Sequence, residues 1–534
     1  MSPEQLVSNK FYYKMSIVKN FTNHINLESV FENLPDPGLA AFVTAAGRHR
    51  RVEAAMNPLA RKTVAMLRAS TSDDGATLSP NIGLFALICF GVGGTVGAGI
   101  FILTGTVAAQ HSGPAVALSF LIASLVCLLA GLCYAELAAM MPVAGSAYSY
   151  THASMGEAAA WAVAWCLVLE YLFAGALVAI GWSAYLQSAL HDVGVRIPAL
   201  LAQAPFTISG NRHLVATGSI IDLPATLVTL ACTAMLLRGT DFSARINTLI
   251  VVIKIAAMLL VVVTGFAFVD PANWSPFIPA NEGVFGRFGW SGVMQGAGVL
   301  FFAYVGFDAV STLAQDVRDP QRTVPRALLA SVGLTTLLYA LVGLVITGLV
   351  SYRLLNVADP IYVALNSAGP GLAWTKIIVG FVAIAGLVSV LLVTLLGQVR
   401  IFYAMGRDRL LPPAFTRMRA GTNIPFTGTL VTGLVASVAA GILPLSLLGE
   451  LISMGTLFAF VMVSASVLVL RRREPEAARP FRVPLYPWTP LLSIAACLYL
   501  MWTLPQDTWL RLVIWLAIGG AVYWLYGLRR KRYA

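Results

Sequence analysis

The sequence predicts an all-α integral membrane protein with about 12 membrane-spanning helices, and three observations predict this fold class. First, 58% of the 534 residues are hydrophobic and only 11% are charged, whereas a soluble chain carries about 25% charged residues. Second, apolar runs recur from about residue 83 to residue 528 without a long polar break. Third, Lys and Arg gather in alternate connecting segments. Lipid therefore covers the surface that polar residues would otherwise cover.

Each apolar run is long enough to cross a hydrocarbon layer about 30 Å thick. Clusters of Pro and Gly separate many of the runs, as at Ser112-Gly113-Pro114. The predicted spans are 83–108, 113–140, 158–189, 219–237, 246–269, 291–314, 327–350, 375–404, 426–443, 448–470, 487–504 and 509–528.

The distribution of basic residues predicts the orientation. With the N-terminus inside, 28 of the 35 Lys and Arg residues fall in cytoplasmic segments and six in outer ones, while Lys254 lies within a span. This is the positive-inside pattern, and it predicts that both termini are cytoplasmic. The predicted parts are a partly disordered extension over 1–80, a membrane domain over 81–530 and a short tail over 531–534. The net charge of +11 thus follows from topology, and no nucleic-acid partner is expected.

The cysteines and histidines predict neither a metal site nor a cofactor. All six cysteines fall inside apolar runs without a CxxC pair, and the six histidines are scattered. No His lies near a Ser or Cys with a third partner in sequence, as a nucleophilic enzyme would need. We therefore expect that the protein is not an enzyme.

The first predicted span carries a dense run of glycine. Five glycines lie among the nine residues 91–99, and each glycine costs a helix about 1 kcal/mol relative to alanine. Close packing of two helices through small residues explains a single glycine pair, but five so close together favour an unwound stretch. The run has no G-x-G-x-x-G register and follows no strand, so it is not a nucleotide-binding fingerprint.

The sixth predicted span repeats this pattern, with Gly296, Gly298 and Gly306 around residues 301–308. If five helices repeat once in inverted topology, spans one and six correspond, and broken helices at such positions mark a binding site near the middle of the membrane. Unwound backbone offers N–H groups to a carboxylate and carbonyl groups to an ammonium. An amino acid carries both groups, so the sequence predicts an amino acid site at the two breaks.

Aromatic residues gather at the second break. Helix packing explains such a cluster within a span, but its position also suits a gate over the substrate. The residues are Phe301, Phe302, Tyr304 and Phe307.

Among the ionisable residues inside the predicted spans, four are candidates for a specific role: Glu136, Glu170, Lys254 and Asp308. Each would cost about 2.5–3.5 kcal/mol at mid-helix facing lipid, so each must face protein, water or another charge. Glu136 is predicted to be a structural group near the cytoplasmic end of span two. For the other three, a buried ion-pair network and a functional role both stay open.

Lys254 has only apolar neighbours in the fifth span. A lysine withdrawn from water can exchange a proton near neutral pH. Alternatively, a fixed ammonium can stand where a sodium ion would stand. Both interpretations make Lys254 a candidate coupling group.

Four stretches resemble signatures of the amino acid–polyamine–organocation superfamily. They are residues 97–105, 134–148, 301–324 and 400–412. The last two are similar to the cationic amino acid transporter branch. The resemblance covers about residues 80–530, and it implies a five-plus-five inverted repeat with helices one and six broken, followed by two further helices.

The resemblance also implies a set of binding residues. The substrate carboxylate would meet the backbone at Gly97, Ala98 and Gly99. The substrate amine would meet carbonyl groups near Thr95, Phe302, Ala303 and Val305.

The resemblance further implies roles for individual side chains. Phe302 would be the gating aromatic, and Glu170 and Asp308 would help to position the amine through water. Lys254 would occupy the sodium position of sodium-coupled relatives, which implies proton symport. Val388 would limit the size of the substrate side chain.

Two positions depart from the family pattern. Ala98 stands in a Gly-Ala-Gly motif where Gly-Thr-Gly is common, so a hydroxyl near the substrate carboxylate is missing. Gln315-Asp316 stands where paired Glu is frequent. An apolar Val388 favours a neutral substrate and the branch resemblance a cationic one, so both classes stay open.

We therefore expect a secondary active, proton-coupled amino acid permease in the cytoplasmic membrane, which works by alternating access. Its expected partners are an amino acid, protons and the lipid bilayer. In this hypothesis, protonation around Lys254 controls how the first helix packs on the fifth. An amino acid exchanger or a transporter-like sensor is the alternative, and a membrane-embedded enzyme is less favoured.

Overall fold

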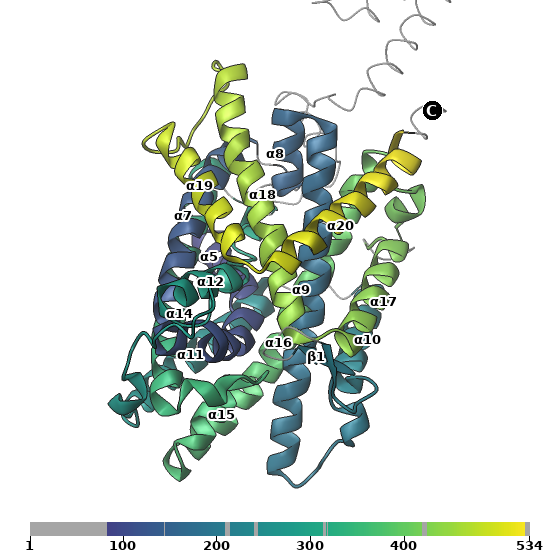
Figure 1. Cartoon of the computed structure of the whole chain (residues 1–534). Coiled ribbons are helices and arrows are strands. Elements are labelled where there is room, and N and C mark those ends of the chain that lie inside the picture. The colour runs from purple at the N-terminus through teal and green to yellow at the C-terminus, as the bar shows by residue number, and fades with distance from the viewer. Residues whose placement is uncertain are drawn as a thin grey trace, which may run out of the picture. The chain divides into compact units, whose positions relative to one another are not determined.

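The computed structural model describes residues 83–141, 143, 145–208, 214–239, 244–312, 317, 319–418 and 424–528. The predicted extension over 1–80 and the predicted tail over 531–534 lie outside the described residues. The described part consists mainly of helices packed side by side (Figure 1).

Among the described residues, seven helical stretches are long and apolar enough to cross a membrane. No water is available in the bilayer to satisfy backbone groups, so a spanning segment must bond its own backbone along its whole apolar length, as a helix does. They are Leu84–Met140, Glu157–Asp192, Thr248–Phe266, Pro320–Leu349, Pro370–Arg407, Leu445–Arg473 and Gln506–Tyr526, and three shorter apolar helices are Leu223–Leu237, Phe426–Ile442 and Trp488–Thr503.

Each of the twelve predicted ranges contains helix in the described residues. How many of these helices cross a membrane stays a prediction. The main ones are α5 (Leu84–Thr95), α7 (Val116–Met140), α9 (Glu157–Asp192), α10 (Leu223–Leu237), α11 (Ala244–Phe266), α12 (Gly289–Leu300), α14 (Pro320–Leu349), α16 (Ala373–Arg407), α17 (Phe426–Ile442), α18 (Leu445–Arg473), α19 (Trp488–Thr503) and α20 (Gln506–Val522).

The prediction of an all-α chain is wrong in one connection. Strands β1 (Phe206–Ile208) and β2 (Leu214–Ala216) form an antiparallel hairpin in which Phe206 faces Ala216. Their aromatic and β-branched residues suit a pleated surface, but a strand of three residues has too little periodicity to be recognised. The prediction also misses two short connecting helices, α8 (Ser146–Met155) and α15 (Pro360–Ser367).

Helix α9 lies at the centre of the described helices. It packs along α16 and α18 and also contacts α17, α10 and α20. Three indole groups join α9 to α20: Trp161 donates to the carbonyl of Gly519, and Trp165 and Trp515 each donate to the other's carbonyl. The rings of Trp165 and Trp515 stack with centroids 5.0 Å apart.

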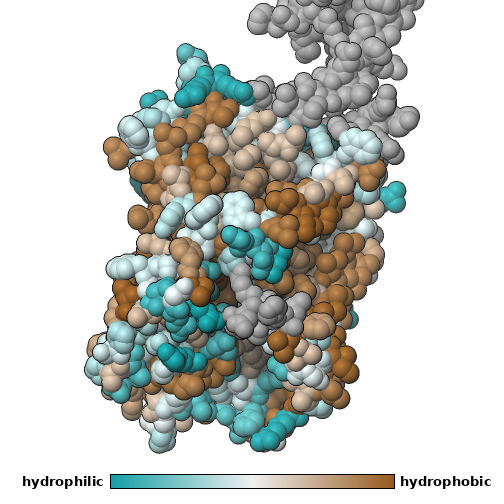
Figure 2. All heavy atoms as spheres, viewed as in Figure 1, coloured by the Kyte–Doolittle hydropathy of each residue, from teal (hydrophilic) through white to brown (hydrophobic). Residues whose placement is uncertain are grey.

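Large apolar side chains cover the outside of several helices, and Figure 2 shows them spread over the visible face. In water such a surface would favour aggregation, whereas in a bilayer it contacts lipid tails. Examples are Leu249, Val263 and Phe266 on α11, Leu434 and Val438 on α17, and Val513 and Ile518 on α20.

Glu136, near the end of α7, lies among hydrogen-bond donors and basic side chains, as expected for the structural group that its position predicts. Its carboxylate accepts two hydrogen bonds from Arg471, at 2.9 and 2.5 Å, and one from the backbone N–H of Val483 at 2.7 Å. The Nε atom of Arg479 lies 3.6 Å from the same carboxylate. The group therefore ties α7 to the end of α18 and the segment that follows it.

Candidate functional site

The first glycine-rich helix is interrupted where the sequence predicts. Helix α5 ends at Thr95, and Val96 has a ψ angle of 84°, outside the helical range. Helical geometry resumes at Ala98, and a π-helical turn, η1, spans Gly99–Leu103 before α6 (Thr104–Val107). The N–H groups of the first turn after the break therefore point toward it.

The second glycine-rich helix is also interrupted. Helix α12 ends at Leu300 and continues as one 3₁₀ turn, η6 (Phe301–Tyr304). Val305 then has a ψ angle of 137°, and Gly306 has a φ angle of +108°. Only glycine adopts such a positive φ without strain, so Gly306 fixes the break.

The two breaks lie against each other. A Cβ atom on Gly99 would lie 2.3 Å from the Cα atom of Ala303, and one on Gly306 would lie 2.7 Å from the backbone of Gly94. Glycine is thus required on both sides because backbone meets backbone here. The structure brings together the segments that hold the predicted carboxylate and amine sites.

We expect the substitution Gly99→Ala to force the two breaks apart and to lower transport at least about tenfold, because overpacking of about 1–3 kcal/mol falls on the site itself. The measurement is uptake into proteoliposomes at matched protein content. Gly333→Ala on α14 is the control, since a Cβ there has no atom within 4 Å. Equal activity of the two variants would contradict the close contact.

Lys254 reaches the first break from α11. Its ammonium donates to the carbonyl of Gly93 at 3.3 Å and to that of Val96 at 3.1 Å. Helix α16 leaves room for its side chain at Gly386, where a Cβ would lie 3.1 Å from the Lys254 chain. The buried ammonium therefore holds carbonyl groups that the break in α5 frees.

Two side chains that sequence reasoning missed bind the backbone at the breaks: Tyr339 contacts both breaks, and Ser453 contacts the second. The Tyr339 hydroxyl on α14 lies 2.7 Å from the carbonyl oxygen of Thr95 and 3.1 Å from that of Ala303. It can therefore donate a hydrogen bond to the backbone of either break. The Ser453 hydroxyl on α18 accepts from the N–H of Phe302 and donates to the carbonyl of Val299. Each of these two spans carries several polar residues, so the sequence has no signal that singles out Tyr339 or Ser453.

The two predicted acidic residues lie near each other beside the second break. Glu170 on α9 is buried, accepts a hydrogen bond from Thr456 at 2.8 Å and interacts electrostatically with Asp308. Asp308 accepts from the N–H of Gly306 at 3.2 Å. The pair therefore connects α9, α18 and the second break.

The aromatic cluster divides into packed rings and one candidate gate. Phe301 and Phe307 each pack edge-to-face with Phe460, and the Tyr304 hydroxyl donates to the carbonyl of Phe120. Among the ring pairs of the described residues, Phe302 is in none, which leaves it the most suitable gate.

Helix α16 meets the first break through Val390, whose Cγ1 atom would lie 3.0 Å from a Cβ on Gly97. Val388, the predicted size-limiting residue, precedes it by two positions and so points about 200° away around the helix. Val388 packs at the edge of the core. Val390 is therefore the residue of this pair that contacts the first break, and the size-limiting role of Val388 stays a prediction. Residues Gln315 and Asp316 lie outside the described part.

Comparison with known proteins gives a consistent result. Residues 82–523 match the sequence model of the amino acid permease family. The chain is 42% identical to a methylthioribose transporter of Bacillus subtilis over 86% of this chain and 96% of that protein. It is 36% identical to a branched-chain amino acid permease of Bacillus subtilis, over 88% of this chain and 98% of the relative. It is 37% identical to a vacuolar cationic amino acid transporter of Arabidopsis thaliana, over 79% and 68%.

Proposed function

The chain belongs to the amino acid permease family, and on that premise we propose that it is a proton-coupled amino acid transporter working by alternating access. It is a multi-pass membrane protein and a transporter, not an enzyme. The substrate would bind where the two broken helices meet.

The contact of Lys254 with the first break carries this proposal. Its ammonium donates to the carbonyl groups of Gly93 and Val96, at the end of α5, and to no carboxylate among the described residues. Loss of its proton would replace the two charge-assisted hydrogen bonds to the carbonyls of Gly93 and Val96 with weaker neutral ones and would loosen the contact between α11 and α5. A proton at this atom therefore changes how the first helix packs, which is what coupling requires.

The binding site follows from the same geometry. We assign the substrate carboxylate to the backbone of Gly97, Ala98 and Gly99, at the start of the half-helix whose N–H groups attract negative charge. The ammonium would take carbonyl groups of Thr95, Phe302, Ala303 and Val305, with Glu170 and Asp308 nearby through water. Phe302 would close over the bound molecule.

We further propose twelve spans in a five-plus-five inverted repeat with two added helices, in a cytoplasmic-type membrane with both termini inside. The charge asymmetry of the connections supports this orientation. The end of the helices that carries the β1–β2 hairpin and α15 would then face outward, and we call it the outer end.

The test is uptake into proteoliposomes with a panel of radiolabelled neutral and cationic amino acids and an imposed inward proton gradient. Saturable uptake of one class that a protonophore collapses and sodium does not alter is the expected result. Uptake only against an internal amino acid would indicate an exchanger. No uptake or exchange of any amino acid by folded protein would indicate a sensor.

Methylthioribose is the second candidate substrate, because a transporter named for it is 42% identical to this chain. Ala98 supports this choice, since a site for a solute without a carboxylate needs no hydroxyl at that position. Labelled methylthioribose therefore belongs in the same panel, and uptake of it alone would replace the amino acid proposal.

A further inference from the structure

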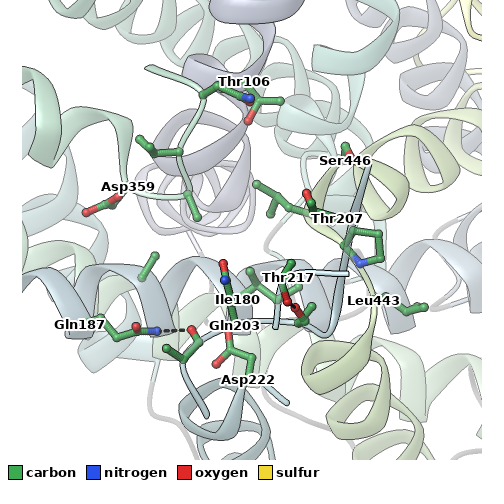
Figure 3. Close-up of a pocket in the computed structure, with 18 of the residues that line it drawn as sticks. Thr106, Ile180, Gln187, Gln203, Thr207, Thr217, Asp222, Asp359, Leu443 and Ser446 are labelled. Atoms are coloured by element: carbon green, nitrogen blue, oxygen red, sulfur yellow. Dashed lines mark hydrogen bonds between the residues drawn. The ribbon is translucent and has the colours of Figure 1, made fainter. Parts of the chain in front are cut away.

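A cavity at the outer end shows where the helices stand apart in this conformation (Figure 3). Its volume is about 450 Å³, and its walls come from α6, the second half of α9, the β1–β2 hairpin, the segment before α15 and the start of α18. In alternating access one end opens while the other is held closed. The contacts at the inner end are therefore the ones that must break before a solute can leave.

Two signature stretches that the candidate site does not use meet at this inner end. Residues 134–148 end at Tyr148 on α8, which lies at the end opposite to α15 in Figure 1, and residues 400–412 include Asp408, directly after α16. The Tyr148 hydroxyl donates to the Asp408 carboxylate at 2.5 Å. Burial and this carboxylate raise the pKa of the Tyr148 hydroxyl, so it keeps its proton and remains the donor.

His152 lies one turn further along α8, on the same face as Tyr148. Its Nδ1 atom is 3.9 Å from the Asp408 carboxylate, and its ring lies beside that of Tyr148 with centroids 5.9 Å apart. The side chains of His152 and Asp408 are only 6% and 15% exposed, so water screens their interaction weakly. Histidine changes its charge between about pH 5 and 8. A proton on His152 therefore turns a polar contact into an ion pair.

Other charged and titratable groups surround this face of α8. They are Glu157 of α9, Arg407 and Arg409 on either side of Asp408, Arg473 of α18 and Tyr523 of η11 (Tyr523–Leu528). Arg473 donates to the carbonyl of Ser154 at 3.0 Å, and Glu157 accepts from the Tyr523 hydroxyl at 2.9 Å. The two arginines beside Asp408 are exposed, so solvent screens them. Glu157 is therefore the alternative partner for a charged His152.

Helix α8 connects the end of α16 to the segment that follows the second break. The hydroxyl groups of Ser146 on α8 and Ser311 on α13 (Ala309–Thr312) are hydrogen-bonded at 3.1 Å. Tyr148 belongs to a cluster of buried side chains, separate from the main core, that includes Met405 and Leu410 at the end of α16. A movement of the second break relative to α16 must therefore strain or break the contact between α8 and the end of α16.

We propose that Tyr148, His152 and Asp408 form a latch that holds the inner end closed, and that a proton on His152 tightens it. The latch is tight at low pH, where His152 is charged, and loosens as the pH rises and the ring loses its proton. Transport therefore slows when the cytoplasmic side becomes acidic, which limits the entry of further protons. The inference rests on the proposed function, because it takes the opening of the inner end from there.

The test is exchange across proteoliposomes of the amino acid that the uptake panel identifies, with the same pH on both sides. Exchange requires the inner end to open, and no proton gradient drives it. Between about pH 7.5 and about pH 5.5, where histidine gains its proton, the rate of the original chain is expected to fall further than that of His152→Gln. The expected difference is about fivefold, the effect of one partly screened ion pair. Glutamine is neutral like the unprotonated ring, so the two chains are expected to exchange at similar rates at the higher pH.

Three further variants make the result specific. Asp408→Asn removes the carboxylate and is expected to lose the pH response, as His152→Gln does. Tyr148→Phe removes the hydrogen bond but keeps both charged groups, so it is expected to exchange faster at both pH values and to keep the response. His191→Gln, at the exposed outer end of α9, is the control and is expected to behave like the original chain.

Equal pH responses in the original chain and in folded His152→Gln protein would overturn the latch and leave the proposed function standing. A response that His152→Gln loses and Asp408→Asn keeps would overturn it as well, because the charge on His152 would then act through Glu157.

Hydrogen–deuterium exchange of the chain in nanodiscs separates this inference from the proposed function, because it needs no substrate. After correction for the intrinsic exchange rate, the amides of α8 are expected to exchange about fivefold more slowly at the lower pH in the original chain and equally at both in His152→Gln. If the chain exchanges no amino acid, the proposed function fails and this protection alone decides. Equal protection of α8 at both pH values in the original chain would overturn the latch.

Discussion

Replacing Lys254 with methionine is expected to abolish gradient-driven uptake, with a fall of at least about 100-fold. Methionine keeps most of the volume and length of the side chain but cannot carry a proton. The carbonyl groups of Gly93 and Val96 lose their shared donor, and donors that carry a charge contribute about 1.5–3 kcal/mol each. The measurement is uptake with an imposed proton gradient, compared with uptake after a protonophore.

The matched control for this variant is Lys376→Met on α16. That lysine also forms a close polar contact, an ion pair at 2.6 Å to Asp192, but the pair is partly exposed and lies near the outer end, away from the breaks. We expect it to lower the melting temperature and to retain gradient-driven uptake. Gradient-driven uptake within a few-fold of the original by Lys254→Met would rule out coupling at this residue.

Replacing Glu136 with glutamine is expected to give the largest loss of stability of any single charge change described here, about 3–5 kcal/mol. The variant leaves the guanidinium groups of Arg471 and Arg479 without their shared counter-charge in a buried place. The measurement is the midpoint of unfolding in detergent, followed by tryptophan fluorescence.

The comparison variant for this prediction is Glu282→Gln. Its ion pair with Arg287 is exposed, with side chains 42% and 43% accessible, and exposed pairs contribute about 0–1 kcal/mol. We expect its unfolding midpoint to match that of the original chain. A similar loss in both variants would mean that the Glu136 pair does not hold α7 to α18.

The features that sequence reasoning predicts correctly are local ones. The breaks follow from glycines close together in the chain, and burial of Lys254 follows from its apolar neighbours. Tyr339, Ser453 and Thr456 could not be found in this way. Each acts on a residue 151 to 286 positions away, and the chain pattern does not say which helix faces lie together.

The choice between Val388 and Val390 shows a second limit. Positions 388 and 390 both hold valine, so an alignment shifted by two residues leaves the residue type unchanged. The two side chains nevertheless lie on opposite sides of the helix. The packing of α16 shows that Val390 lies against Gly97, and the role of Val388 stays a prediction. The β1–β2 hairpin is missed for a related reason, because three-residue strands carry no usable period.

The indole bonds between α9 and α20 have a consequence for biogenesis. Trp165 and Trp515 are 350 residues apart, and ribosomes add about 5–20 residues per second, so roughly 20–70 s separate their synthesis. During that interval α9 lies in the bilayer before α20 has been synthesised. Trp165 therefore lacks its contact with Trp515 until the end of synthesis. The last helix therefore completes the assembly, and a chain that terminates before residue 506 would insert but remain open to quality-control proteases.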